Sequence, residues 1–116
     1  PGAFSGEEEV DVAEGETVFT AGEESDYLYY IVSGSYNIIV NDAVVSQLSA
    51  KDIFVGEMSF LLNNRRSATV LAAEAGTLIR ISKEAFIDAI KTHPHYGLFL
   101  ARLLAQRLQQ LHAVYG

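Results

Sequence analysis

The sequence contains no cysteine, no tryptophan, only two prolines and few basic residues. The absence of cysteine excludes disulfides, thiol catalysis and cysteine-based zinc sites. No apolar run reaches the roughly 18 residues that a membrane-spanning helix needs, and no basic-then-apolar signal peptide opens the chain. Eight Lys and Arg face fifteen Asp and Glu, a net charge of −7, which argues against binding long nucleic acids through many phosphate contacts. One small anion held by a local arginine remains compatible with this charge.

What the sequence does contain is enough apolar material for one domain. Its 116 residues are 49% hydrophobic, so a core can form without a metal or a disulfide. We therefore expect a single domain over residues 1–116. The first residue is Pro1 rather than Met, as in a piece of a longer protein. Acidic residues gather between Glu7 and Asp26, and because their spacing fits no calcium loop, we interpret them as a solvated face.

Short apolar segments separated by turns follow one another from Val10 to about Ile81. The segments 28–32, 36–40 and 44–45 are rich in β-branched residues and tyrosine, and the polar pair Asn41-Asp42 predicts a hairpin. Many short strands with glycine turns favour a sandwich, a jelly roll or a barrel. Residues 83–92 and about 96–115 have helical spacing, with an apolar stripe of Leu104, Leu108, Leu111 and Tyr115. The predicted fold is mainly β with C-terminal helices, an α+β arrangement.

The segment from Phe54 to Val70 interrupts the strand pattern. Gly56 precedes a short apolar stretch, 57–62, that reads as one or two helical turns, whose first amides are unpaired and suit an anion. Arg66 follows, and a guanidinium can hold a phosphate through two parallel hydrogen bonds. Ser67 can add a donor, and Glu57 suits a sugar hydroxyl. These residues predict a ligand with one phosphate and one ribose, although a structural ion pair between Glu57 and Arg66 explains them equally well.

This segment resembles the phosphate-binding cassette of the cyclic nucleotide-binding domain family. The matching residues are Gly56, Glu57, Arg66, Ser67, Ala68 and Thr69. The segments 15–34 and 70–86, the pair His93-Pro94 and the closing leucine-rich helix also match. The resemblance covers about residues 10–114, and together these motifs are far more specific than any one of them.

The resemblance implies an eight-stranded jelly-roll barrel, also called a double-stranded β-helix, that binds cyclic AMP or cyclic GMP as ligand and needs no metal. It implies that Arg66 pairs with the cyclic phosphate and that Glu57 accepts from the ribose 2′-hydroxyl. The last helix would act as a lid and place residues beside the base. The implied ligand-binding residues are Gly56, Glu57, Met58, Ser59, Arg66, Ser67, Ala68, Leu111 and His112, and none is catalytic.

Several positions depart from the family pattern. Val55 separates Phe54 from Gly56, the segment 52–56 is one residue longer than usual, Lys51 stands where glycine is common, and Arg65 replaces a common proline. We interpret Arg65 as a solvated surface charge. Ser67 stands where threonine accompanies a preference for cyclic GMP, so we expect cyclic AMP to be preferred.

The predicted function is a regulatory, non-enzymatic cyclic-nucleotide sensor in the cytoplasm, coupled to an effector domain in a longer chain or acting as a homodimer. A ligand-free jelly-roll module that dimerises through the leucine stripe is the alternative. A cupin-type metalloenzyme is disfavoured, because it needs clustered histidines on barrel strands and His93, His95 and His112 all lie in the helical tail. Direct DNA binding is disfavoured, because no helix-turn-helix follows the last helix.

Overall fold

The computed structural model describes the backbone of residues 8–115 and the side chains of residues 8–109. The chain divides into two compact units, a β unit over residues 6–83 and a helical unit from Glu84 onward.

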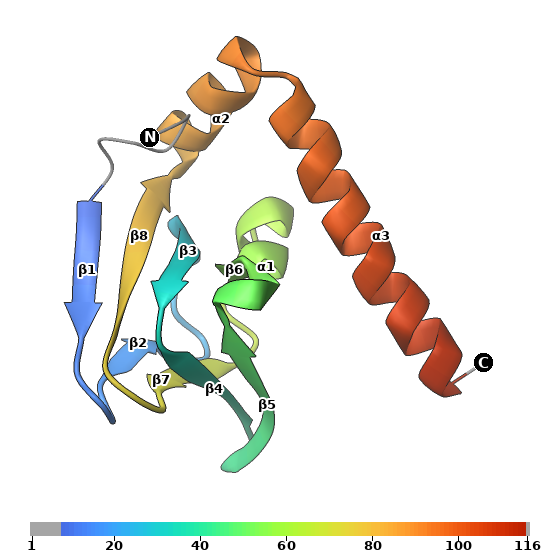
Figure 1. Ribbon diagram of the computed structural model, residues 1–116. Coiled ribbons are helices and arrows are strands. Elements are labelled where there is room, and N and C mark those ends of the chain that lie inside the picture. The colour runs from blue at the N-terminus through green and yellow to red at the C-terminus, as the bar shows by residue number, and fades with distance from the viewer. Residues whose placement is uncertain (1–7, 116) are drawn as a thin grey trace. The chain divides into compact units, whose positions relative to one another are not determined.

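The β unit consists of two four-stranded antiparallel sheets (Figure 1). One sheet has the order β1-β8-β3-β6 and the other the order β2-β7-β4-β5. The expected jelly roll with eight strands is therefore confirmed. The strands are β1 (Glu8–Val12), β2 (Thr17–Phe19), β3 (Tyr27–Ser33), β4 (Ser35–Val40), β5 (Ala43–Ser49), β6 (Phe54–Val55), β7 (Thr69–Ala72) and β8 (Gly76–Ser82).

The core lies between the two sheets because alternate residues of the strands point inward. Tyr29 and Ile31 of β3, Tyr36 of β4 and Leu78 of β8 belong to this buried core. The Tyr36 hydroxyl donates to the carbonyl of Ser33 at 2.8 Å, which satisfies its polar end inside the core.

The predicted hairpin joins β4 to β5, which pair in antiparallel register. Asn41 and Asp42 both have positive φ, at 50° and 64°, as a type I′ turn requires. This is the turn that matches the right-handed twist of the two flanking strands. The hairpin predicted at Asn41-Asp42 is therefore confirmed.

A short connection leads from β5 to the cassette. It contains a 3-10 helix, η1 (Ala50–Asp52), followed by Ile53 with φ 73° and ψ −58°. This conformation is close to a classic γ-turn, which is rare and strained, the more so for a β-branched residue. Ile53 lies in the segment 52–56, which is one residue longer than is usual in the family that the sequence resembles.

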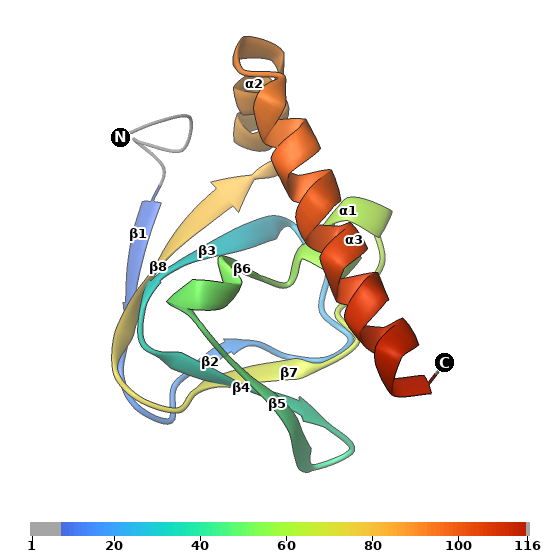
Figure 2. The same ribbon diagram turned by 45° about the vertical axis from the view of Figure 1, so that its right-hand side comes forward.

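The helical unit contains α2 (Lys83–Thr92) and α3 (His95–Tyr115). Both Figure 1 and Figure 2 show α3 as one continuous helix that follows α2 after a short break at residues 93–94. Pro94 accounts for the break, since proline disfavours a helical residue before it. Within the described residues, no helix is both long enough and apolar enough to cross a membrane.

Candidate functional site

The cassette connects β6 to β7 and begins at Gly56. Gly56 has φ 82° and precedes α1 (Glu57–Leu62), the short helix that the sequence predicted. A Cβ atom at this position would lie 2.5 Å from Nη1 of Arg66 and 3.0 Å from the ring of Phe19. The backbone conformation and this close approach both require glycine. Glu57 follows at the start of α1 and is buried.

Arg66 lies inside the β unit with only 4% of its surface exposed. Its Nη1 donates to the carbonyl of Gly56 at 2.7 Å and to the hydroxyl of Ser59 at 3.0 Å. Its Nη2 donates to the carbonyl of Tyr27. The guanidinium carbon lies 4.0 Å from the ring centroid of Phe19. The side chain therefore points inward, as the ligand hypothesis requires.

Counting its donors shows what Arg66 has left for a ligand. A guanidinium carries five N–H bonds, and the three contacts above occupy both hydrogens of Nη1 and one of Nη2. Nε is buried and has no hydrogen-bond partner among the described residues. A buried donor without a partner costs about 1–3 kcal/mol, and more on a charged group. An anion reaching Nε and the remaining hydrogen of Nη2 would remove that cost.

The electrostatic environment leaves this cation charged at neutral pH. Burial lowers the pKa of the Arg66 guanidinium below its ordinary value, because the charged form loses its hydration. Nearby Tyr29, Glu23 and Asp26 oppose the effect by favouring the charged form. Arginine starts so far above neutrality that this shift leaves it protonated.

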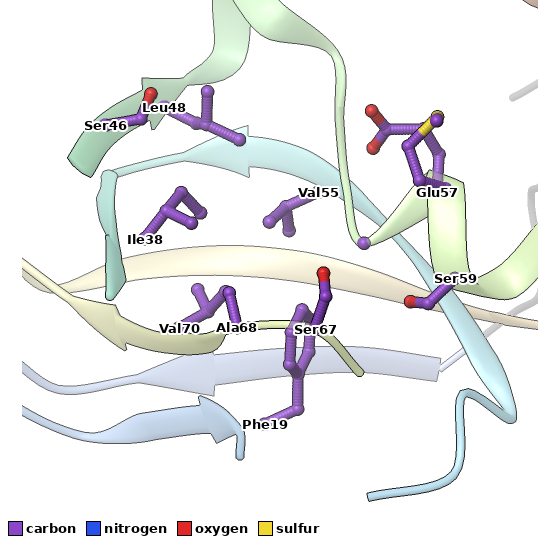
Figure 3. A pocket seen from close by; sticks show the side chains of 12 residues that line it. Phe19, Ile38, Ser46, Leu48, Val55, Glu57, Ser59, Ser67, Ala68 and Val70 are labelled. Atoms are coloured by element: carbon purple, nitrogen blue, oxygen red, sulfur yellow. The ribbon is translucent and has the colours of Figure 1, made fainter. Parts of the chain in front are cut away.

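A cavity of about 230 Å³ opens next to Arg66 (Figure 3). The side chains of Glu57, Ser59 and Ser67 lie toward α1, and Ile38 and Leu48 lie toward β5. The cavity thus offers polar groups at one end and an apolar surface at the other. Its lining residues are Phe19, Ile38, Ser46, Leu48, Val55, Gly56, Glu57, Met58, Ser59, Ser67, Ala68 and Val70.

Most of the residues predicted to bind ligand come together at this cavity. Six of them line it, namely Gly56, Glu57, Met58, Ser59, Ser67 and Ala68. Arg66 is absent from the lining and lies behind Gly56, Ser59 and Phe19, which it contacts. Leu111 and His112 lie outside the residues whose side chains the structure describes.

The sequence did not predict the apolar half of the cavity, nor the contact between Arg66 and the ring of Phe19. Strand alternation places Ile38 and Leu48 on an inner face, but an inner face can be solid core as easily as cavity wall. Ser46 on β5 is the hydroxyl at the apolar end (Figure 3). No signal in the sequence distinguished Phe19 from an ordinary core residue.

Arg65, in contrast to the buried Arg66, is exposed to solvent. Its side chain is 69% exposed and lies 3.8 Å from Glu24, and its Nη1 donates to the carbonyl of Gly22 at 2.9 Å. The interpretation of Arg65 as a surface charge is confirmed. In the described part of the chain, no three His, Asp or Glu side chains gather closely enough to hold a metal ion.

Comparison with known proteins gives one family. The model of the cyclic nucleotide-binding domain matches residues 9–93. The cAMP-activated global transcriptional regulator CRP of Salmonella typhimurium is 34% identical over 99 residues, which are 80% of this chain and 47% of the relative. The Pycsar effector protein PaPycTIR of Pseudomonas aeruginosa is 31% identical over 101 residues, 86% of this chain and 32% of the relative. The chain thus spans less than half the length of these two relatives.

Solved structures agree on the fold. The catabolite activator protein of Thermus thermophilus superimposes with a TM-score of 0.85 at 26% identity, covering 96% of this chain and 54% of the other. A cyclic nucleotide-binding domain from Methylobacillus flagellatus superimposes with a TM-score of 0.76 at 24% identity, covering 88% and 62% of the two chains.

Proposed function

The chain belongs to the cyclic nucleotide-binding domain family, and we propose that it is a non-catalytic sensor that prefers cyclic AMP to cyclic GMP. The observation that carries this proposal is the buried Arg66, whose Nε has no partner among the described residues, beside a cavity with polar groups at one end. A cyclic nucleotide combines one phosphate, one ribose and one base, which is the chemistry that such a cavity accommodates. The whole chain from residue 1 to residue 116 acts in this proposal as one ligand-binding domain.

The polar end of the cavity receives the sugar and the cyclic phosphate. Arg66 donates to the phosphate through Nε and the remaining hydrogen of Nη2. The Ser67 hydroxyl and the amides of Gly56, Glu57 and Ala68 add donors, and the Glu57 carboxylate accepts from the ribose 2′-hydroxyl. Met58 and Ser59 complete the wall on the side of α1.

The base occupies the apolar end of the cavity. Ile38, Leu48 and Val70 supply an apolar surface for a purine. Ser67 in place of threonine favours cyclic AMP by resemblance, and CRP, a relative at 34% identity, is named as cAMP-activated. Leu111 and His112 of α3 are the proposed contacts beside the base.

Signalling requires that the ligand bind one arrangement of the protein better than another, since equal affinity shifts no equilibrium. We assign the moving element to α3, which would pass ligand occupancy to an effector domain in a longer chain or to a second copy, in the cytoplasm. Hydrogen exchange along α3 should change when cyclic AMP is added. Identical protection with and without the nucleotide would contradict this coupling.

The experiment that tests binding compares two adjacent arginines. A hydrogen bond to a charged group contributes about 1.5–3 kcal/mol, roughly tenfold to a hundredfold in affinity. In isothermal titration calorimetry with cyclic AMP and cyclic GMP, Arg66→Ala should weaken binding by at least that factor, and Arg65→Ala should change it little. Arg66→Gln, with circular dichroism on both variants, controls for a loss of folding. Equal losses at the two positions, or no binding by the wild-type chain, would refute the proposal.

A further inference from the structure

Phe19 ends β2, is 92% buried and contributes its ring to the cavity wall. The Arg66 guanidinium carbon lies 4.0 Å from the centroid of this ring, whereas the ring of Tyr29 is 5.9 Å away. Because Gly56 has no side chain, nothing separates the ring from the guanidinium on that side. Phe19 is therefore the aromatic ring over which the Arg66 guanidinium lies more closely.

The other contacts of Arg66 are hydrogen bonds donated by its two terminal nitrogens. They are accepted by the carbonyl of Gly56, the hydroxyl of Ser59 and the carbonyl of Tyr27. These three acceptors hold the terminal nitrogens, and they belong to the cassette, to α1 and to β3 respectively. They leave Nε free, so the direction in which Nε points depends on the plane of the guanidinium. A ring 4.0 Å from the guanidinium carbon limits how far that plane can turn.

All four of these contacts are electrically neutral. Two are carbonyls, one is a hydroxyl, and the fourth is the negative face of an aromatic ring. A carboxylate at the same distance would hold Arg66 more tightly, but it would also cancel the charge that an anionic ligand needs. In a water-poor site a cation and a ring attract each other more strongly than in water. The contact with the ring thus offsets part of the free-energy cost of burying the guanidinium without neutralising its charge.

We propose that Phe19 is the positioning residue of Arg66: its ring orients the guanidinium and so sets the affinity for the phosphate of the ligand. Phe19 itself need not touch the phosphate. The effect on affinity rests on the proposed function, whereas the effect on Arg66 is a property of the free protein. These two effects can be measured separately.

The test changes the charge distribution of the ring with only a small change in its size. Phenylalanines carrying one to five ring fluorines are introduced at position 19 of the full chain, which progressively weakens the negative face of the ring. The dissociation constant for cyclic AMP should rise with each step, by about 3-fold to 30-fold for the pentafluoro ring. The matched control is the same series at Phe54, which is also buried, pairs with Tyr30 and does not line the cavity. That control should change the dissociation constant by less than about twofold.

A second measurement needs no ligand. The Nε–H proton of Arg66, assigned by its disappearance in Arg66→Lys, should resonate upfield in the free protein, because the guanidinium carbon lies over the ring of Phe19, 4.0 Å from its centroid. Phe19→Leu should move this resonance back downfield and speed its exchange with water. Equal fluorine effects at positions 19 and 54, or an Arg66 resonance that Phe19→Leu leaves in place, would overturn the proposal. If the wild-type chain binds no cyclic nucleotide, the proposed function fails, and the resonance alone still decides the role of Phe19.

Discussion

Replacing Gly56 by alanine tests whether the cassette depends on the close approach of its backbone to Arg66. Gly56 has φ +82°, and an added Cβ would lie 2.5 Å from Nη1 of Arg66 and 3.0–3.1 Å from two ring atoms of Phe19. Phe19 is buried and cannot retreat easily. The guanidinium would have to move instead and would lose at least one of the bonds that Nη1 donates.

Two effects set the expected loss of stability. A left-handed backbone costs an alanine about 1–2 kcal/mol, and losing a hydrogen bond of a charged group costs about 1.5–3 kcal/mol. The free energy of unfolding should therefore fall by about 2.5–5 kcal/mol. Gly22→Ala is the matched control, because Gly22 has φ +92° and nothing within 4 Å of the added Cβ. It should lose only the backbone contribution, about 1–2 kcal/mol.

The stability of both variants is measured by urea unfolding followed by far-UV circular dichroism. The six tyrosines of the chain provide a second spectroscopic probe, since it has no tryptophan. Losses of stability extrapolated to water are compared together with the slopes of the transitions. If Gly56→Ala and Gly22→Ala lose the same amount, the guanidinium is not held against Gly56, and the arrangement described for Arg66 is wrong.

Two further predictions concern the buried hydroxyl groups of Tyr29 and Ser25 near Arg66 and α1. Burial raises the pKa of Tyr29 above its ordinary value of 10.0, so the folded state holds this proton more tightly, and the free energy of unfolding should fall as the pH rises above about 10. Tyr29→Phe should lessen that fall in urea titrations between about pH 9 and pH 11, and an unchanged slope would contradict the shift. Ser25 is buried and its hydroxyl contacts the carbonyls of Ser59 and Asn64 at 2.9 Å and 2.6 Å. Ser25→Ala should cost about 1–3 kcal/mol in urea unfolding, whereas Ser46→Ala, at an exposed serine, should cost less than about 0.5 kcal/mol.

Features that depend on neighbouring residues in the chain were predictable from the sequence. The alternation in 36–40 and the pair Asn41-Asp42 specify a hairpin through local sterics and strand periodicity. The glycine before 57–62 specifies where α1 begins, and the structure places α1 at Glu57–Leu62. In each case one short segment contains the whole physical cause.

Features that depend on distant segments were not predictable in this way. Phe19 and Arg66 are 47 positions apart in the chain. The pairing of β2 with β7, and the backbone hydrogen bonds of Arg66 with Gly22 and Glu23, bring their segments together. The acceptors of Arg66 include a main-chain carbonyl at Tyr27, and any residue type supplies a carbonyl. The extra residue before Gly56 could be recognised in the sequence. The positive φ of Ile53 could not, because isoleucine on its own disfavours that conformation.

The arrangement around Arg66 also determines what kind of switch this site can be. A group that responds to pH must change its charge near neutrality, and a guanidinium does not, even with its pKa lowered by burial. The cost of an unpartnered Nε therefore does not depend on pH in the physiological range, and an acceptor that reaches Nε would remove it. Because the acceptors hydrogen-bonded to Arg66 are neutral, an anionic ligand can approach the cation without first displacing a carboxylate bonded to it, although Glu23 and Asp26 act on the charge from nearby. We therefore expect Arg66 to contribute to a response to an anionic ligand and not to a response to proton concentration.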